Sequence, residues 1–162
     1  MKMTIKFVII GFLLLNIRLV NAQVDPINNE GIAIGGYDVV NYFTTGNPIK
    51  GSRAYYSIHG GVTYLFSSSN NKKLFESNPS NYLPQFDGYC ALAVSYGKKI
   101  SINPETFKIV GDKLYLFYHT KSENRETNSL ETWNKNENKL LQKADQLWPD
   151  VKKKKYESEK LF

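Results

Sequence analysis

The sequence holds few of the residues from which reactive sites are usually built. Cys90 is the single cysteine in 162 residues, and His59 and His119 are the two histidines. One cysteine excludes an internal disulfide, so packing alone must hold the fold. No H-x-x-x-H or C-x-x-C spacing occurs, which excludes a local metal motif. The pair Gly35-Gly36 lacks the spacing of a phosphate-binding loop.

A hydrophobic run long enough to cross a bilayer is also missing, since a spanning helix takes about 20 residues. A shorter apolar run at 7–15 follows Lys2 and Lys6, and small residues end at Ala22. This order is typical of a secretory signal peptide. We therefore expect residues 1–22 to be removed near Ala22. The mature protein is then periplasmic or secreted and has no transmembrane segment.

The formal net charge of +6 comes from the ends of the chain. Lys2, Lys6 and Arg18 lie in the predicted signal peptide, and residues 151–162 hold five lysines against two glutamates. The body between them is balanced, whereas a nucleic-acid-binding domain carries a basic stripe on its folded surface. We expect no nucleic-acid partner. The Lys-rich end at 151–162 is interpreted as a solvated tail, with weak attraction to anionic surfaces as the lesser reading.

Short segments of regular hydrophobic spacing predict one domain over residues 31–150, after a linker at 23–30. An apolar strand is expected at 32–34, and Asp38 is expected to cap a short helix. Alternating apolar residues around glycine-containing turns predict two hairpins, at 56–66 and 107–118. The serines that follow the first hairpin are expected to cap a helix that ends before Pro79. No internal repeat is evident.

The C-terminal part of the domain shows helical spacing. Apolar residues from Leu130 to Trp148 recur at steps of three and four, which predicts one long amphipathic helix that Pro149 stops. Strands and helices do not alternate along the chain. The predicted fold class is therefore α+β, with a small antiparallel sheet built from two hairpins. This sheet packs against short helices and the long C-terminal helix.

The segment QFDGYCALAVSYG leaves three roles open for Cys90. The thiol could be a nucleophile that His59 or His119 activates. It could instead be a metal ligand, and together with the histidines it would form a soft site that prefers copper. The small apolar neighbours favour the third role, a buried core residue. Asp87 is explained by the turn before Gly88 and is a secondary candidate ligand.

Three segments together resemble the exported bacterial proteins that contain a YHS domain. They are GGYDVVNYFTTGNPIKG, YYSIHGGVTYLFSSSNNKKLFESNPSNYLPQFDGYCALAV, and KIVGDKLYLFYH followed by ADQLWPDV. The resemblance covers about residues 31–151. The wider family is thought to bind heavy metals through cysteines in the pattern Y-F-C-x-x-x-C. Phe66 matches the aromatic residue of this pattern, whereas Ser67 and Asn71 stand where its cysteines would be. Tyr56 replaces the histidine of the naming triplet.

The resemblance implies a fold, an exported location and a link to metals, but no established activity. We therefore predict a non-enzymatic binding module for a small ligand, with copper or another soft metal as the first candidate. Its predicted ligands are Cys90 and His59, with His119 and Asp87 as secondary ligands. Two alternatives remain. One is a cysteine-dependent enzyme that uses Cys90 with a histidine, and the other is a structural or protein-interaction domain with an unknown protein partner.

Overall fold

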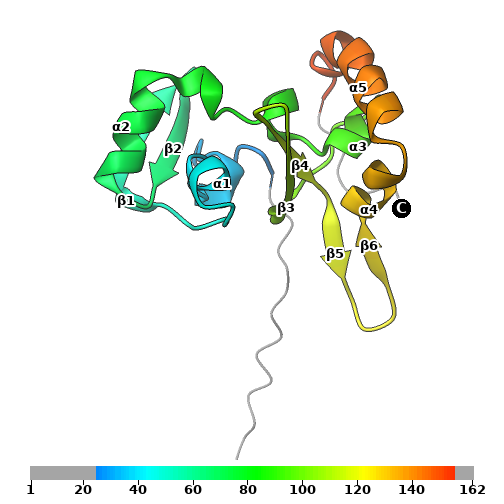
Figure 1. Cartoon of the computed structure of the whole chain (residues 1–162), viewed down its shortest axis with the longest axis horizontal. Helices are drawn as coiled ribbons and strands as arrows, with labels where there is room; N and C mark the ends of the chain where they lie inside the picture. Colours follow the sequence, from blue (N-terminus) through cyan, green and yellow to red (C-terminus); the bar gives the residue numbers. More distant parts are fainter. Residues whose placement is uncertain (1–24, 156–162) are drawn as a thin grey trace, which may run out of the picture.

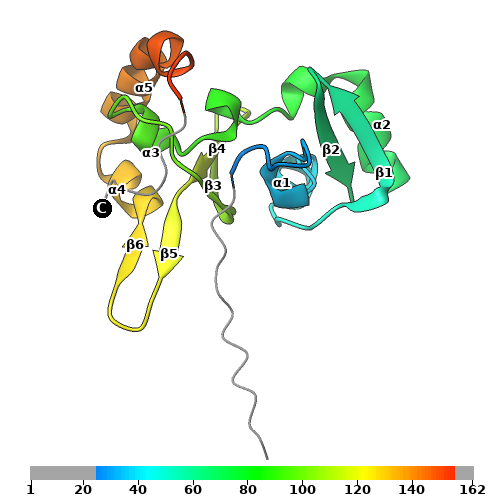
Figure 2. The same ribbon diagram turned by 180° about the vertical axis from the view of Figure 1, so that it is seen from behind.

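The computed structural model describes residues 25–155, so the predicted signal peptide at 1–22 lies outside the described residues. Within this part of the chain the predicted α+β class is confirmed: three two-stranded antiparallel sheets pack with short helices and a C-terminal helix. No helix of residues 25–155 is long and apolar enough to span a membrane. Figures 1 and 2 show the elements gathered into two halves that lie side by side.

The first half, residues 34–77, is built around one hairpin. Its elements are η1 (Ile34–Gly36), α1 (Asn41–Thr44), β1 (Ser52–His59), β2 (Val62–Phe66) and α2 (Ser69–Ser77). Gly60 and Gly61 both have positive φ, at 58° and 79°, as a two-residue hairpin turn requires. Ser68 caps α2, because its hydroxyl accepts a hydrogen bond from the Asn71 backbone N–H at 3.1 Å.

The second half, residues 79–151, has the same kind of hairpin and more helix. Its elements are η2 (Pro79–Asn81), η3 (Gln85–Gly88), α3 (Ala91–Val94), β3 (Asn103–Val110), β4 (Lys113–Phe117), β5 (His119–Lys121), β6 (Glu126–Asn128), α4 (Ser129–Lys135) and α5 (Glu137–Val151). The turn at Gly111-Asp112 again has two positive φ angles. The β5–β6 hairpin projects away from the body of this half (Figure 1).

The expectation of a chain without internal repeats is wrong. The second hairpin repeats the register of the first, including the same irregularity near the start of the longer strand, at a spacing of 51 positions. The corresponding pairs are Ser52–Phe66 with Asn103–Phe117, Tyr56–Leu65 with Phe107–Leu116, and His59–Val62 with Val110–Lys113. A four-residue helix precedes each hairpin and a longer helix follows it, so the two halves share one plan.

Several finer expectations need correction. The two hairpins form separate sheets rather than one. Residues 32–34 are not a strand; they make isolated bridges and enter η1. The C-terminal helical pattern is divided into α4 and α5, because Asn136 has an extended φ of −148°. Pro149 lies inside the last turn of α5 rather than ending it. Pro149 has no N–H to donate to the Asp145 carbonyl, yet the helical backbone continues to Val151.

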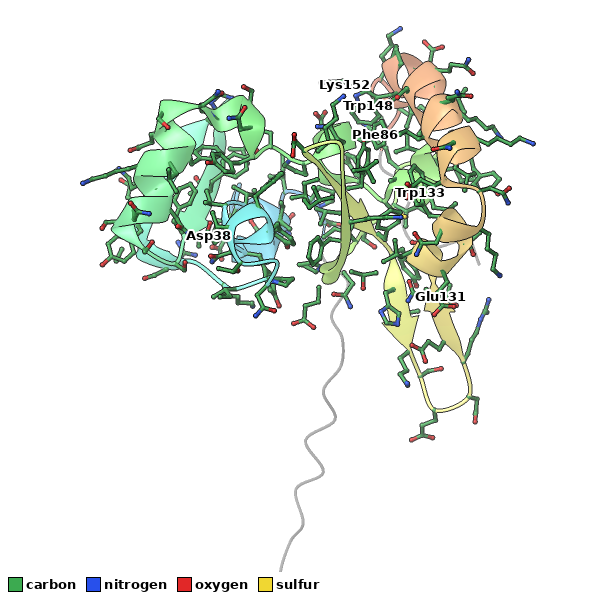
Figure 3. All side chains as sticks on the ribbon, viewed as in Figure 1. Asp38, Phe86, Glu131, Trp133, Trp148 and Lys152 are labelled. Atoms are coloured by element: carbon green, nitrogen blue, oxygen red, sulfur yellow. The ribbon has the colours of Figure 1, made fainter. Side chains whose placement is uncertain are left out.

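A single hydrophobic core joins the two halves. The Tyr42 hydroxyl of α1 donates to the Pro104 carbonyl at 2.8 Å, and its ring packs edge-on against Phe107 at 4.9 Å. Trp133 is fully buried between β4 and the C-terminal helices (Figure 3) and contacts the ring of Phe117 at 5.4 Å. Aromatic pairs of this kind add stability beyond the area that they bury.

Candidate functional site

Cys90 lies in the core, at the start of α3, and is fully buried. Its sulfur is 3.4 Å from the Ser129 hydroxyl oxygen, and that hydroxyl donates to the Tyr118 carbonyl at 2.8 Å. Since the Ser129 proton is used in this way, the thiol is the donor to Ser129. Burial raises the pKa of the Cys90 thiol, so the neutral form is favoured. A nucleophilic cysteine needs the opposite, an accessible thiolate.

The internal repeat gives Cys90 a counterpart in the first half. Cys90 corresponds to Asp38 of the first half: each follows a Gly-Tyr pair, precedes a short helix and is fully buried. The Ser67 backbone N–H, just after β2, donates to Asp38 at 2.8 Å. In the second half, backbone groups that include Tyr118, just after β4, partly offset the effect of burial on the pKa of Cys90. Asp38 and Cys90 therefore occupy the same place in the shared plan.

Asp38, which Figure 3 labels beside α1, is the centre of a polar cluster that joins α1, the end of β2 and α2. Its Oδ1 accepts from the Val40 N–H at 2.9 Å. Its Oδ2 accepts from the Ser67 N–H and hydroxyl and from Asn71 Nδ2, each at 2.8 Å, and from Asn41 Nδ2 at 3.2 Å. The carboxylate is thus the acceptor of five hydrogen bonds, which suits a structural role. The expected cap is wrong: Val40 is at the N-cap of α1, which has no side-chain cap bond, and Asp38 instead accepts from the Val40 N–H ahead of the helix.

This cluster also contains the two positions at which the YHS pattern has cysteines. Ser67 and Asn71 converge on Asp38, and Asn71 Nδ2 also donates to Asn41 Oδ1 at 3.1 Å. Oxygen and amide groups replace the soft sulfur ligands here, and the hydrogen bonds within the cluster use them. The donor set therefore does not fit a soft metal at this place.

His119 lies in the second half and is bonded to residues of that half. It begins β5, where its Nδ1 lies 3.1 Å from the Thr106 hydroxyl and its Nε2 lies 2.9 Å from Glu126. Both ring nitrogens thus have partners within the second half. These contacts fix the base of the projecting β5–β6 hairpin and suit a structural role.

His59 and Asp87 both line a pocket of about 480 Å³ between the two halves. His59 comes from the end of β1, where its ring meets Phe75 edge-on at 6.0 Å, and Asp87 comes from η3. Lys152, which follows the end of α5, also lines the pocket. The remaining lining residues are Pro26, Ile27, Ala33, Gly60, Val62, Tyr64, Leu83 and Pro84. The pocket therefore combines apolar walls with a few polar groups, as ligand sites commonly do.

The ion pair between Lys152 and Asp87 in this pocket is weak. Lys152 Nζ lies 3.3 Å from Asp87, and both side chains are about half exposed, at 59% and 49%. Exposed ion pairs of this kind contribute about 0 to 1 kcal/mol. Lys152 also lies over the Trp148 ring at 5.8 Å, and the two are labelled next to Phe86 in Figure 3. Burial and the nearby Asp87 charge raise the pKa of Tyr64 to about 12.

The four residues predicted as metal ligands do not form one site. His59 and Asp87 share the pocket, Cys90 does not line it, and His119 is engaged elsewhere. Across residues 25–155 no group of three or more His, Cys, Asp or Glu side chains is placed to hold a metal ion. Sequence reasoning missed Lys152, which it assigned to the tail, because only the folded chain returns the end of α5 to the pocket.

No known protein family, curated protein or solved structure matches this chain. The resemblance to exported YHS-domain proteins therefore stays a prediction.

Proposed function

We propose that the protein is an exported, non-enzymatic binding domain whose small ligand occupies the pocket between the two halves. The observation that carries this proposal is the meeting of His59, Asp87 and Lys152 in one pocket, from three separate segments of the chain. A weak ion pair between Asp87 and Lys152 can exchange either partner for a ligand without a large loss of stability.

From the sequence, the first candidate for this ligand is a metal ion such as copper. In the pocket its protein ligands would be the His59 imidazole and the Asp87 carboxylate. With the Cys90 sulfur outside the pocket, this pair suits Cu(II) or Zn(II) better than Cu(I), which thiolate ligands select. Two protein ligands predict weak binding, and Lys152 competes with a cation for Asp87.

Calorimetric titration of the chain from Gln23 onward with Cu(II) and Zn(II) tests the proposal. This chain keeps every residue of the described fold. His59→Ala and Asp87→Asn are each expected to weaken binding about tenfold or more, because each removes one of two ligands. Lys152→Met is expected to strengthen binding, because it frees the Asp87 carboxylate from a competing cation.

Two variants serve as controls. Asp150→Asn removes a carboxylate that is exposed on the same helix and paired with Lys153, and should leave metal affinity unchanged. Cys90→Ala should also bind as the wild type does. Loss of binding in Cys90→Ala, or equal binding by His59→Ala and the wild type, would contradict the proposed site. If Lys152→Met weakens binding of a ligand, that ligand is an anion rather than a metal cation.

A further inference from the structure

The exposed hydrophobic surface of the described chain is concentrated on one strand. Six large hydrophobic side chains are exposed among residues 25–155: Ile27, Ile49, Tyr55, Tyr56, Ile58 and Tyr96. Three of these belong to β1, where Ile58 is 65% and Tyr56 is 52% exposed. Single exposed apolar residues are ordinary, whereas a group of them on one element indicates an interaction site.

The geometry of the hairpin places Tyr56 and Ile58 on a single face. Ser57 pairs with Tyr64, whose ring packs on Phe75 of α2, and His59 also meets Phe75. Side chains alternate along a strand, so Tyr56 and Ile58 point to the face opposite α2. This face is directed to solvent on the β1 side of the hairpin.

The second half shows what this face looks like when it is covered. The positions that correspond to Tyr56 and Ile58 are Phe107 and Ile109, and both are partly buried against the core. Phe107 packs on the ring of Tyr42, which belongs to the first half. The same face of the shared plan is thus covered by this protein's own residues in one half and left open in the other.

The outer edge of β1 is open as well. β2 is the one strand that pairs with β1 in the described sheets, and the other edge of β2 is occupied by backbone bonds between Thr63 and residues Gly31 and Ala33. Natural edge strands usually carry a lysine, a proline or an inward charge that blocks pairing. None of these residue types occurs from Ala54 to Ile58. In Figures 1 and 2, β1 lies on the side of the first half that faces away from the second.

We propose that β1 is a self-association surface, on which a second copy of this chain pairs antiparallel about a two-fold axis. Such pairing is isologous, so Tyr56 and Ile58 of one copy lie beside Tyr56 and Ile58 of the other on the same face of the joined sheet. The charges beside the strand fit this arrangement. Lys72 and Glu76 of α2 border the groove of about 470 Å³ that Tyr56 and Ile58 also line. The two-fold axis reverses their order, which places Lys72 of each copy toward Glu76 of the other.

Sedimentation equilibrium of the chain from Gln23 onward should show a concentration-dependent monomer–dimer equilibrium. Ile58→Glu should raise the dissociation constant at least about tenfold, because it places a charge in the apolar contact. This side chain is mostly exposed in the single chain, so circular dichroism should show an intact fold. Tyr96→Glu is the matched control: an exposed aromatic residue on the second half, whose loss should leave the equilibrium unchanged.

A charge exchange separates the contact between copies from the ion pair within one chain, in which Lys72 and Glu76 lie 2.9 Å apart. Lys72→Glu alone and Glu76→Lys alone should each weaken dimers, because like charges then meet across the axis. An equimolar mixture of these two variants should recover dimers, since opposite charges meet again. The unfavourable pair within each chain persists in the mixture, so recovery can arise only between copies.

Each of the following results would overturn the inference. One is a monomer at every concentration up to about 1 mM, the range in which weak association becomes visible. The other is a dimer that Ile58→Glu does not weaken, or that the mixture of charge variants does not restore. A monomer that binds a different protein through Tyr56 and Ile58 would likewise replace the second copy as the partner.

Discussion

At the scale of single residues, a carboxylate is held in the core of the first half by hydrogen bonds alone. Asp38 is fully buried, and its five hydrogen-bond donors are backbone and uncharged side-chain groups. An isolated buried charge is costly, but donors aimed at a carboxylate offset much of that cost. The same donors become buried and unsatisfied if the carboxylate is removed. The cluster therefore makes Asp38 sensitive to substitution.

We expect Asp38→Ala to lower the free energy of unfolding by about 3 kcal/mol or more, because several buried donors lose their acceptor. Urea denaturation followed by circular dichroism measures this loss. Asp150→Ala is the control, since that side chain is 81% exposed and should change stability by less than about 0.5 kcal/mol. Equal losses in the two variants would show that the cluster contributes nothing.

Some of these residues could be identified from the sequence, but their assembly could not. The small apolar neighbours of Cys90 favour burial, and the cysteine is buried. The capping interpretation of Asp38 is wrong, since Val40 is the N-cap of α1, and it foresaw none of the bonds to residues 67 and 71. Those bonds join positions about 30 residues apart in the chain. No local pattern specifies such a contact, because it depends on how α2 packs beside α1.

At the scale of elements, the end of α5 is held by a buried lysine. Lys99 Nζ donates to the carbonyls of Lys152 at 2.7 Å and Lys154 at 2.8 Å. The last carbonyls of a helix lack partners within the helix and form the negative end of its dipole, so a cation is favoured there. Lys154 in turn donates to the Gly97 carbonyl. The backbone of residues 152–154 is thus bonded to the domain, while their side chains remain exposed, as expected of a solvated end.

Lys99→Met should lower the free energy of unfolding by about 1 to 2 kcal/mol, since it removes two hydrogen bonds and a favourable charge. Hydrogen exchange should become faster at the backbone amides of residue 148 and residues 150–154. Lys139→Met, on the exposed face of α5, is the control and should change neither quantity. If exchange at the end of α5 is unaltered in Lys99→Met, the lysine does not hold the helix.

The elements themselves were predictable where a local signal is strong. The turns at Gly60-Gly61 and Gly111-Asp112 mark both hairpins, since few residues other than glycine, asparagine and aspartate tolerate positive φ. The break at Asn136 had a signal that the sequence analysis passed over, because Asn134, Asn136 and Asn138 surround it and asparagine favours turns and helix caps over helix interiors. Pro149 gave a misleading signal, because α5 continues for two residues beyond it, to Val151.

At the scale of the whole molecule, a buried thiol and buried tyrosine hydroxyls make the free energy of unfolding decrease at alkaline pH. Burial raises the pKa of the Cys90 thiol and of several tyrosines, and that of Tyr64 rises to about 12. The affected tyrosines are Tyr37, Tyr42, Tyr64, Tyr89 and Tyr115. In the unfolded chain these groups lose their protons from about pH 9 to 10 upward. The folded state keeps the protons to higher pH, so it binds more protons than the unfolded state does.

The free energy of unfolding should therefore keep its full contribution from these groups below about pH 9 and decrease as the pH rises further. Urea midpoints measured from pH 7 to pH 11 test this. Tyr64→Phe cannot titrate at this position and should lose less stability over the same range. If the variant and the wild type lose stability in parallel, Tyr64 is not part of the alkaline loss.

The arrangement of the two halves was the least predictable feature. The hairpins share Tyr-Leu-Phe in their second strands, at residues 64–66 and 115–117, but the surrounding residues differ. The repeat becomes clear from the pairing register rather than from sequence identity. The pocket depends on this arrangement, because its lining comes from both halves and from the end of α5.

The repeat also shows where the chain tolerates an insertion. In the first half, two residues, Ser67 and Ser68, carry the chain from β2 to α2, whereas the second half uses the β5–β6 hairpin for the corresponding passage. The fold therefore accepts both a minimal link and a long excursion at this point. The exposed tip of that hairpin, closed by the bond from the Ser122 N–H to the Arg125 carbonyl, is a natural attachment point for a tag or a second protein.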